Sequence, residues 1–125
     1  MAREIFKLVG GSDWSHSRHY VYGGDRGDIG RLALAVAHAA DTDPEARQIL
    51  RSAGHELARL GDAMTLRFGP RPIALAGRAL ELHSIIAEAA REALPVDTRV
   101  QVRASNGHHA AARIALNALQ SEPPR

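Results

Sequence analysis

Gly77 is the residue of this sequence whose setting best suits ligand binding. It follows a short apolar segment, residues 72–76, and precedes a helical segment, so it stands where a buried strand gives way to a helix. A glycine at such a turn lets a nucleotide approach the backbone closely. Ligands of parallel sheets bind outside the carboxyl ends of the strands, which here are residues 76–78 and 104–107. A lone glycine is a weak signal, and a plain strand-to-helix turn explains it equally well.

The histidines and serines do not indicate a metal site or a hydrolase. His16 and His19 are three residues apart, and His108 and His109 are adjacent. Neither pair has the four-residue spacing at which two histidines of one helix bind zinc. No serine stands in a Gly-x-Ser-x-Gly nucleophile turn. We therefore expect neither a metal site nor a catalytic residue in this chain.

The composition is that of one domain with a core of small aliphatic side chains. Of its 125 residues 45% are hydrophobic but only 4% aromatic, and there is no cysteine, which excludes disulfides and thiolate metal sites. A net charge of +2 and the alternation of arginines with acidic residues argue against a nucleic-acid partner. We expect no signal peptide in residues 1–8, no membrane span and a cytoplasmic location.

The N-terminal half is predicted to contain two short strands followed by two helices. The strands are expected at residues 4–9 and 19–22, a glycine-rich loop at residues 23–30 and a helix at residues 29–40. The next helix, residues 43–64, begins with Asp43 as N-cap and Pro44 at the first helical position. Gly54 and Gly61 lie inside it, and each costs about 1 kcal/mol relative to alanine, so we expect another element to pack closely there.

The C-terminal half reads as a β-α-β-α series. We predict strands at residues 72–76 and 99–103, the second near a sheet edge, and helices at residues 80–94 and 108–119. Residues 105–107 form a turn, and residues 121–125 a frayed tail. Strands joined by a helix are expected to be parallel with a right-handed crossover.

These segments, in this order, resemble the C-terminal lobe of the BadF/BadG/BcrA/BcrD-type ATPases, which include N-acetylglucosamine kinases, within the sugar kinase–Hsp70–actin superfamily. The resemblance covers residues 1–120 and implies an α/β fold: one lobe of the actin-like (ribonuclease H-like) ATPase fold, with a short mixed sheet and flanking helices. Four stretches carry it. Residues 10–11 with 24–27 are similar to the family's Gly-Gly-Trp-Gly … Gly-Asp-Glu-Gly-Ser, residues 43–54 to its Gly-Asp-Pro-x-Ala-Arg helix, residues 72–77 to its adenosine-motif strand, and residues 107–113 to the turn into its last helix.

The chain also departs from the family pattern. Arg26 and Asp28 replace the Glu and Ser of the acidic loop, Arg78 replaces a second small residue of the adenosine turn, and Trp14 lies several residues from the family's loop tryptophan. The sequence has no Asp-x-Gly-x-Thr phosphate hairpin and no second phosphate loop. The resemblance therefore implies ATP with Mg²⁺ as the ligand, but no phosphoryl transfer by this chain alone.

The nucleotide site implied by the resemblance consists of Gly77, Arg78, Ala53 and Gly54. Arg78 either donates to a phosphate or fills the adenine pocket, and an exposed arginine without a role is the more ordinary interpretation. Ala53 and Gly54 either form a wall for the adenine ring or only permit close helix packing.

The sugar site implied by the resemblance consists of Gly24, Asp25 and Gly27, with Asp25 bonding the hydroxyls of an amino sugar. The alternative, which we favour, is that Asp25 only stabilises a glycine turn.

Two functions remain open from the sequence. The first is the nucleotide-binding lobe of a BadF-type ATPase or sugar kinase, working with a first lobe on another chain or with one cut away from this chain. The second is a non-catalytic, truncated kinase-fold module that acts by self-association, as a homodimer, or by binding another partner.

Overall fold

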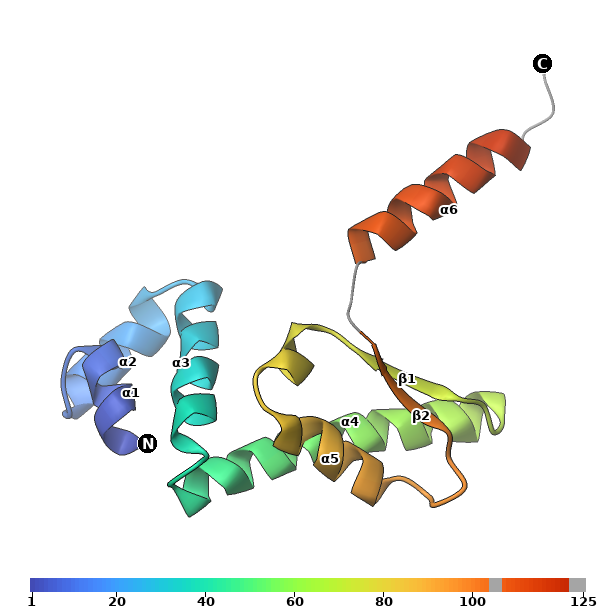
Figure 1. Ribbon diagram of the computed structural model, residues 1–125. Helices are drawn as coiled ribbons and strands as arrows, with labels where there is room; N and C mark the ends of the chain where they lie inside the picture. The colour runs from blue at the N-terminus through green and yellow to red at the C-terminus, as the bar shows by residue number, and fades with distance from the viewer. Residues whose placement is uncertain (104–106, 122–125) are drawn as a thin grey trace.

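The chain is an α/β protein, mostly helical, with one small parallel sheet. A computed structural model describes residues 1–103 and 107–121 (Figure 1). Its elements in chain order are α1 (Ala2–Val9), α2 (Trp14–Gly23), α3 (Arg26–Ala39), α4 (Pro44–Phe68), β1 (Ile73–Ala76), the 3-10 helix η1 (Arg78–Glu81), α5 (Ser84–Ala93), β2 (Val100–Arg103) and α6 (Gly107–Ser121).

The two strands expected near the N-terminus are wrong, because residues 4–9 and 19–22 lie in α1 and α2. In α1 the apolar Ile5, Phe6 and Val9 recur at helical spacing, and Gly10 ends the helix in the left-handed conformation with φ 86°. In α2 the side chain of Asp13 accepts from the His16 N–H at 3.0 Å and so caps the helix. This local capping outweighs the preference of the aromatic and β-branched residues of α2 for a strand.

Hydrogen bonds from the backbone N–H and then the ring of His16 hold the pKa of Asp13 below its usual range. Both groups favour the charged carboxylate, and a charged N-cap suits the positive end of the helix dipole.

The long helix α4 begins as the sequence predicted. Asp43 is its N-cap, with Oδ1 accepting from the N–H groups of Glu45 at 3.0 Å and Ala46 at 3.4 Å. The Met1 ammonium group donates to the other carboxylate oxygen at 2.8 Å. The ammonium group first, and then the two N–H groups, hold the pKa of Asp43 below its usual range.

Arg47 fixes the turn between α3 and α4. Its Nε donates to the carbonyl oxygen of Ala40 at 2.6 Å, and its Nη2 donates to the carbonyl oxygen of Asp41. Ala40 is the C-cap of α3 and Asp41 is the next residue, so both hydrogen bonds hold the turn that follows the helix. Asp43 and Arg47 thus begin one helix and close the end of the preceding one.

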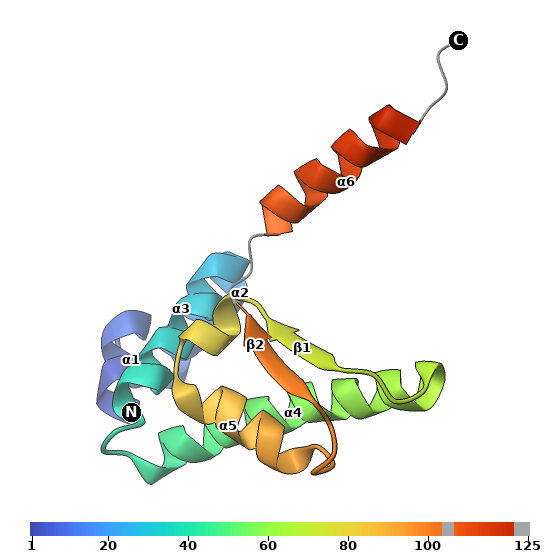
Figure 2. The same ribbon diagram turned by 45° about the vertical axis from the view of Figure 1, so that its right-hand side comes forward.

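Close packing at the two internal glycines of α4 is confirmed. A Cβ atom on Gly54 would lie 2.5 Å from the carbonyl oxygen of Ile86 and 2.7 Å from the Cβ of Ala89, both in α5. A Cβ on Gly61 would lie 2.9 Å from Cδ1 of Ile73 in β1. The absence of a side chain at Gly54 lets the backbone of α5 lie directly on α4 (Figure 2), and at Gly61 it leaves room for the Ile73 side chain of β1.

The sheet has two parallel strands in the described part of the chain, rather than the mixed arrangement that we expected. The register pairs Ile73 with Val100 and Ala76 with Arg103. The parallel direction and the edge position of β2 are confirmed. Helix α5 begins at Ser84, later than expected, because the His83 ring nitrogen Nδ1 accepts from the Ile85 N–H and caps it.

The helices expected at residues 29–40 and 108–119 are both present. The helix expected at residues 29–40 exists but begins earlier, at Arg26. Helix α6 is confirmed, stands apart from the other elements in Figures 1 and 2, and includes Ser121, so the expected tail is wrong at that residue. Residues 104–106, which include the first two residues of the turn expected at 105–107, and residues 122–125 lie outside the described residues.

The core lies where α3, α4 and α5 meet. Small and medium side chains fill it, as the composition predicts: Val36, Ala39, Ala40, Ala46, Leu50 and Ile86. Leu34 of α3 and Ala93 of α5 are exposed, although their apolar spacing suits an inward face. No helix in residues 1–103 and 107–121 is long and apolar enough to cross a membrane.

We predict opposite effects for alanine at two helical glycines. Gly54→Ala should lower the free energy of unfolding by about 1–3 kcal/mol, because the methyl group overlaps α5. Gly30→Ala is the control: nothing lies within 4 Å of its Cβ position in α3, so the substitution should stabilise by about 0.5–1 kcal/mol. Urea unfolding followed by circular dichroism measures both. A Gly54→Ala variant as stable as Gly30→Ala would contradict the packing described for α4 and α5.

Candidate functional site: the carboxyl edge of the sheet

Gly77 lies directly after β1, in a backbone conformation that only glycine adopts readily. Its φ is 125° and its ψ 159°. Nothing lies within 4 Å of the position that its Cβ would occupy. Packing therefore does not require a glycine here, whereas the backbone turn does, and the turn leaves open space beside the end of the strand.

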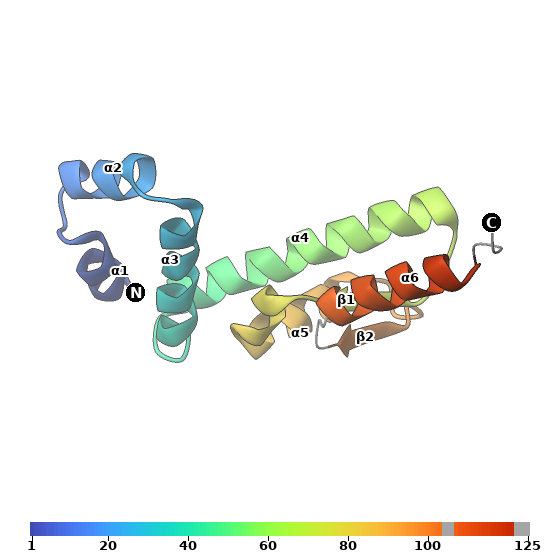
Figure 3. The ribbon, with the colours of Figure 1, turned by 90° about the horizontal axis from the view of Figure 1, so that it is seen from above.

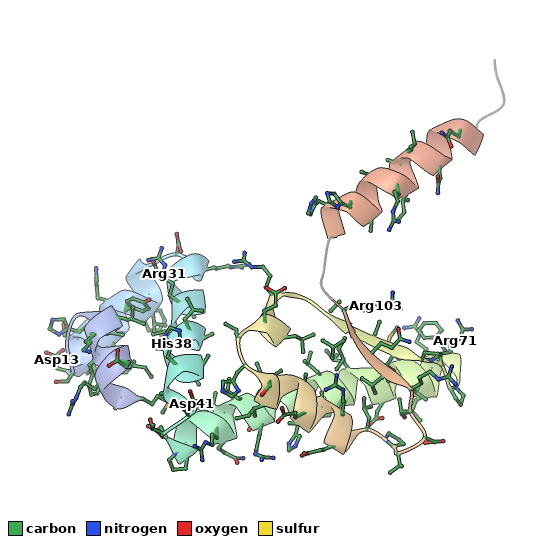
Figure 4. All side chains as sticks on the ribbon, in the orientation of Figure 1. Asp13, Arg31, His38, Asp41, Arg71 and Arg103 are labelled. Atoms are coloured by element: carbon green, nitrogen blue, oxygen red, sulfur yellow. The ribbon has the colours of Figure 1, made fainter. Side chains whose placement is uncertain are left out.

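Two arginines flank this open turn. Arg78 begins η1, is exposed, and has no ion-pair partner among the described residues. Arg103 ends β2 and pairs in register with Ala76, the residue before Gly77. Its guanidinium group donates to the side-chain oxygen of Gln101 at 2.6 and 3.1 Å. Figure 4 labels Arg103 at the end of the strand.

Arg103 is the candidate residue that our sequence reasoning missed. The signal was present, because aligning the apolar positions of residues 73–75 with those of residues 100–102 in parallel places Arg103 beside Ala76. Arg78 and Arg103 thus place two positive charges near the carboxyl edge of the sheet, with Glu81 of η1 in the same short helix as Arg78. Such an arrangement can bind an anionic group.

Ala53 and Gly54 lie on α4, on different sides of the helix. Ala53 is exposed, whereas Gly54 is buried against Ile86 and Ala89 of α5. Helix packing accounts for the glycine at position 54. Leu57, one turn after Ala53, lines a groove between α4 and β1 together with Ala76, whereas Ala53 and Gly77 do not line it.

Gly24, Asp25 and Gly27 form the N-terminal cap of α3. Asp25 accepts from the Asp28 N–H at 2.9 Å, and Asp28 accepts from the Asp25 N–H at 3.1 Å, which is a capping box. A Cβ on Gly24 would lie 2.8 Å from the Tyr20 carbonyl oxygen, and one on Gly27 would lie 2.9 Å from Asp25 Oδ1. The cap gives each of the three residues a structural role.

An apolar groove of about 450 Å³ runs between α4 and β1. We call it the α4–β1 groove. One wall is the C-terminal half of α4, from Leu57 to Phe68, and the other is the whole of β1. Arg71, labelled near the C-terminal end of α4 in Figure 4, also lines it. The sequence reasoning did not predict this groove, because the exposed and buried apolar residues of α4 form one continuous 3–4 pattern.

The histidines do not converge on a metal site. Within the part of the chain that the structure describes, no three His, Asp or Glu side chains are grouped so that they could hold a metal ion. The rings of His108 and His109 contact each other edge-on, with centroids 4.1 Å apart. His83, besides capping α5, places Nε2 3.7 Å from a carboxylate oxygen of Asp41.

Comparisons with protein-family models, with curated proteins and with solved structures find no match for this chain.

We predict that Asp25 contributes to stability through its oxygen atom rather than its charge. Asp25→Ala should lower the free energy of unfolding by about 1 kcal/mol, because the Asp28 N–H loses its acceptor. Asp25→Asn should stay close to the parent protein, because the amide oxygen still caps α3. Urea unfolding distinguishes the two variants. Equal loss in both would indicate that the charge, and not the cap, is what α3 requires.

Proposed function

We propose that this chain is the nucleotide-binding lobe of a BadF-type ATPase or N-acetylglucosamine kinase-like protein that takes ATP with Mg²⁺. The observation that carries the proposal is the open, glycine-specific turn at Gly77 between two arginines, at the carboxyl end of a parallel strand. This is the edge at which parallel α/β sheets bind ligands. In this proposal the adenosine lies against the Gly77 backbone and Ala53, and the phosphates lie near Arg78 and Arg103.

The proposal extends to a sugar site at the N-terminal end of α3. In Figure 1 this end and the carboxyl ends of both strands lie toward the same side of the molecule, which supports a common substrate side. In the proposal Gly24, Asp25 and Gly27 bind an amino sugar. Asp25 Oδ1 already accepts from Asp28, so the carboxylate uses its remaining capacity for a sugar hydroxyl.

Phosphoryl transfer in this proposal requires a first lobe supplied by another chain. Transfer depends on groups that position Mg²⁺ and the reacting oxygens. The described residues provide arginines at the sheet edge but no cluster of acidic residues there. The role proposed for this chain is therefore to bind the nucleotide, in the cytoplasm, and to present it to its partner.

Thermal unfolding with ATP–Mg²⁺ tests nucleotide binding. At ten times the Kd, binding stabilises by about 1.4 kcal/mol and should raise Tm by about 3–6 °C. Ala53→Leu should abolish the increase by filling the adenine side of the site, and Arg78→Ala should reduce it by removing a phosphate donor. Ser52→Leu is the matched control. Ser52 is also exposed, but as the residue before Ala53 it faces a different direction from α4.

For Gly77→Val the Tm must be compared with and without nucleotide in the same variant, because a side chain at φ 125° strains the backbone and lowers Tm by itself. Its Tm should be low without nucleotide, and ATP–Mg²⁺ should not raise it. No increase in the parent protein at millimolar ATP–Mg²⁺ would contradict the proposal.

A further inference from the structure

Helix α4 has a second row of apolar side chains, which is exposed except at Leu57, where it borders the core. We call it the α4 stripe: Ile49, Ala53, Leu57, Leu60, Met64 and Phe68. Steps of three or four residues keep the row on one side of the helix. Leu60 is 65% exposed, Met64 57% and Phe68 51%. An exposed apolar row of this length marks an interaction surface.

The strand beside the stripe has an open edge. The Ile73 N–H donates to the Arg99 carbonyl oxygen at 2.9 Å, so Ile73 faces β2. The N–H and C=O of one strand residue point to the same side, and successive residues alternate. The backbone groups of Ala74 and Ala76 therefore point away from β2, where no other strand pairs with them in the described part of the chain. An unpaired edge of this kind readily accepts another strand.

Both features open into the α4–β1 groove. Leu57, Leu60, Met64 and Phe68 of the stripe line it, together with all of β1. Figure 3, seen from above, shows that α4 continues well beyond α5, and Figure 1 shows that α6 stands apart from this part of the helix. A ligand for the groove must supply both a strand and an apolar helix face. This chain itself has that combination.

We propose that a second copy of the chain binds the α4–β1 groove in a two-fold symmetric dimer. Pairing β1 with its copy in antiparallel orientation about Leu75 places Ala74 opposite Ala76 of the second copy. These are the residues whose backbone groups point to the open side, so each N–H meets a C=O. The sheet then has the strand order β2-β1-β1-β2, and the two α4 helices lie antiparallel beneath it.

Charge along α4 favours a second copy over an unrelated partner. Glu56, whose carboxylate also accepts from Arg59 of the same helix at 2.9 Å, and Arg67 lie on the same flank of the α4 stripe, because eleven residues (67 − 56) make three helical turns. Their midpoint, between residues 61 and 62, lies close to the midpoint of Leu60 and Met64. An antiparallel pair of α4 helices centred there brings Glu56 opposite Arg67 of the second copy at both ends of the contact. Such self-complementarity is what a two-fold interface requires.

The first test is the oligomeric state without nucleotide, so that it does not depend on the proposed nucleotide site. Sedimentation velocity should show a dimer with a micromolar Kd. Leu60→Glu and Met64→Glu should each weaken it by about tenfold or more, because they place a charge in the apolar contact. Leu66→Glu is the matched control: Leu66 is 88% exposed on the opposite side of the same helix, and the variant should dimerise like the parent protein.

A charge exchange tests the orientation of the two helices. Glu56→Arg and Arg67→Glu should each weaken the dimer, and the double variant should restore it. Circular dichroism confirms that each variant is folded. A parent protein that is monomeric at about 100 µM overturns the proposal, as does a dimer that Leu66→Glu weakens while Leu60→Glu leaves it unchanged.

Discussion

The close contact between α4 and α5 at Gly54 is the constraint on which the rest of the fold depends. With the carbonyl oxygen of Ile86 only 2.5 Å from the position of a Cβ on Gly54, the two helix backbones touch. Helix α5 is part of the continuous segment β1-η1-α5-β2, so fixing α5 on α4 also fixes both strands. At Gly61 the contact is with a side chain instead: Cδ1 of Ile73 in β1 lies 2.9 Å from the position that a Cβ would occupy. The close packing at Gly54 and Gly61 therefore positions the carboxyl edge of the sheet, where Gly77 lies.

Several residues that resemble a family pattern have structural roles of their own. Asp43 caps α4, Arg47 closes the end of α3, and Asp25 belongs to a capping box. Each satisfies backbone groups that a helix end leaves without partners. These roles are compatible with ligand binding but do not depend on it. Gly77 differs, because the space around it is open and its neighbours Arg78 and Arg103 are exposed.

The helices α3 to α6 and both strands could be predicted from the sequence, whereas α1 and α2 could not. Helix α4 has a strong N-cap and a long apolar period, and β1 is an apolar run that ends in glycine, so local signals and burial agree. In residues 4–9 and 19–22 the apolar and aromatic residues suit a strand as well as a helix. The C-cap Gly10 of α1 and the N-cap Asp13 of α2 decide in favour of helices.

The candidate site was predicted in part. Gly77 and Arg78 lie at the end of β1, where the sequence placed them, but Arg103 joins them only through the register of the two strands. The α4–β1 groove was missed for a related reason. The apolar positions of α4 belong to two rows, and only the position of α5 shows which row is buried.

The most direct measurement of the central claim is an NMR titration of the chain with ATP–Mg²⁺. If nucleotide binds at the carboxyl edge of the sheet, the largest changes in backbone amide shift will fall at Gly77 and Arg78, with smaller ones at Ala53 and Arg103. The amides of α1 will not move. Unchanged shifts at Gly77 and Arg78 at millimolar nucleotide, or larger changes elsewhere, would contradict the account.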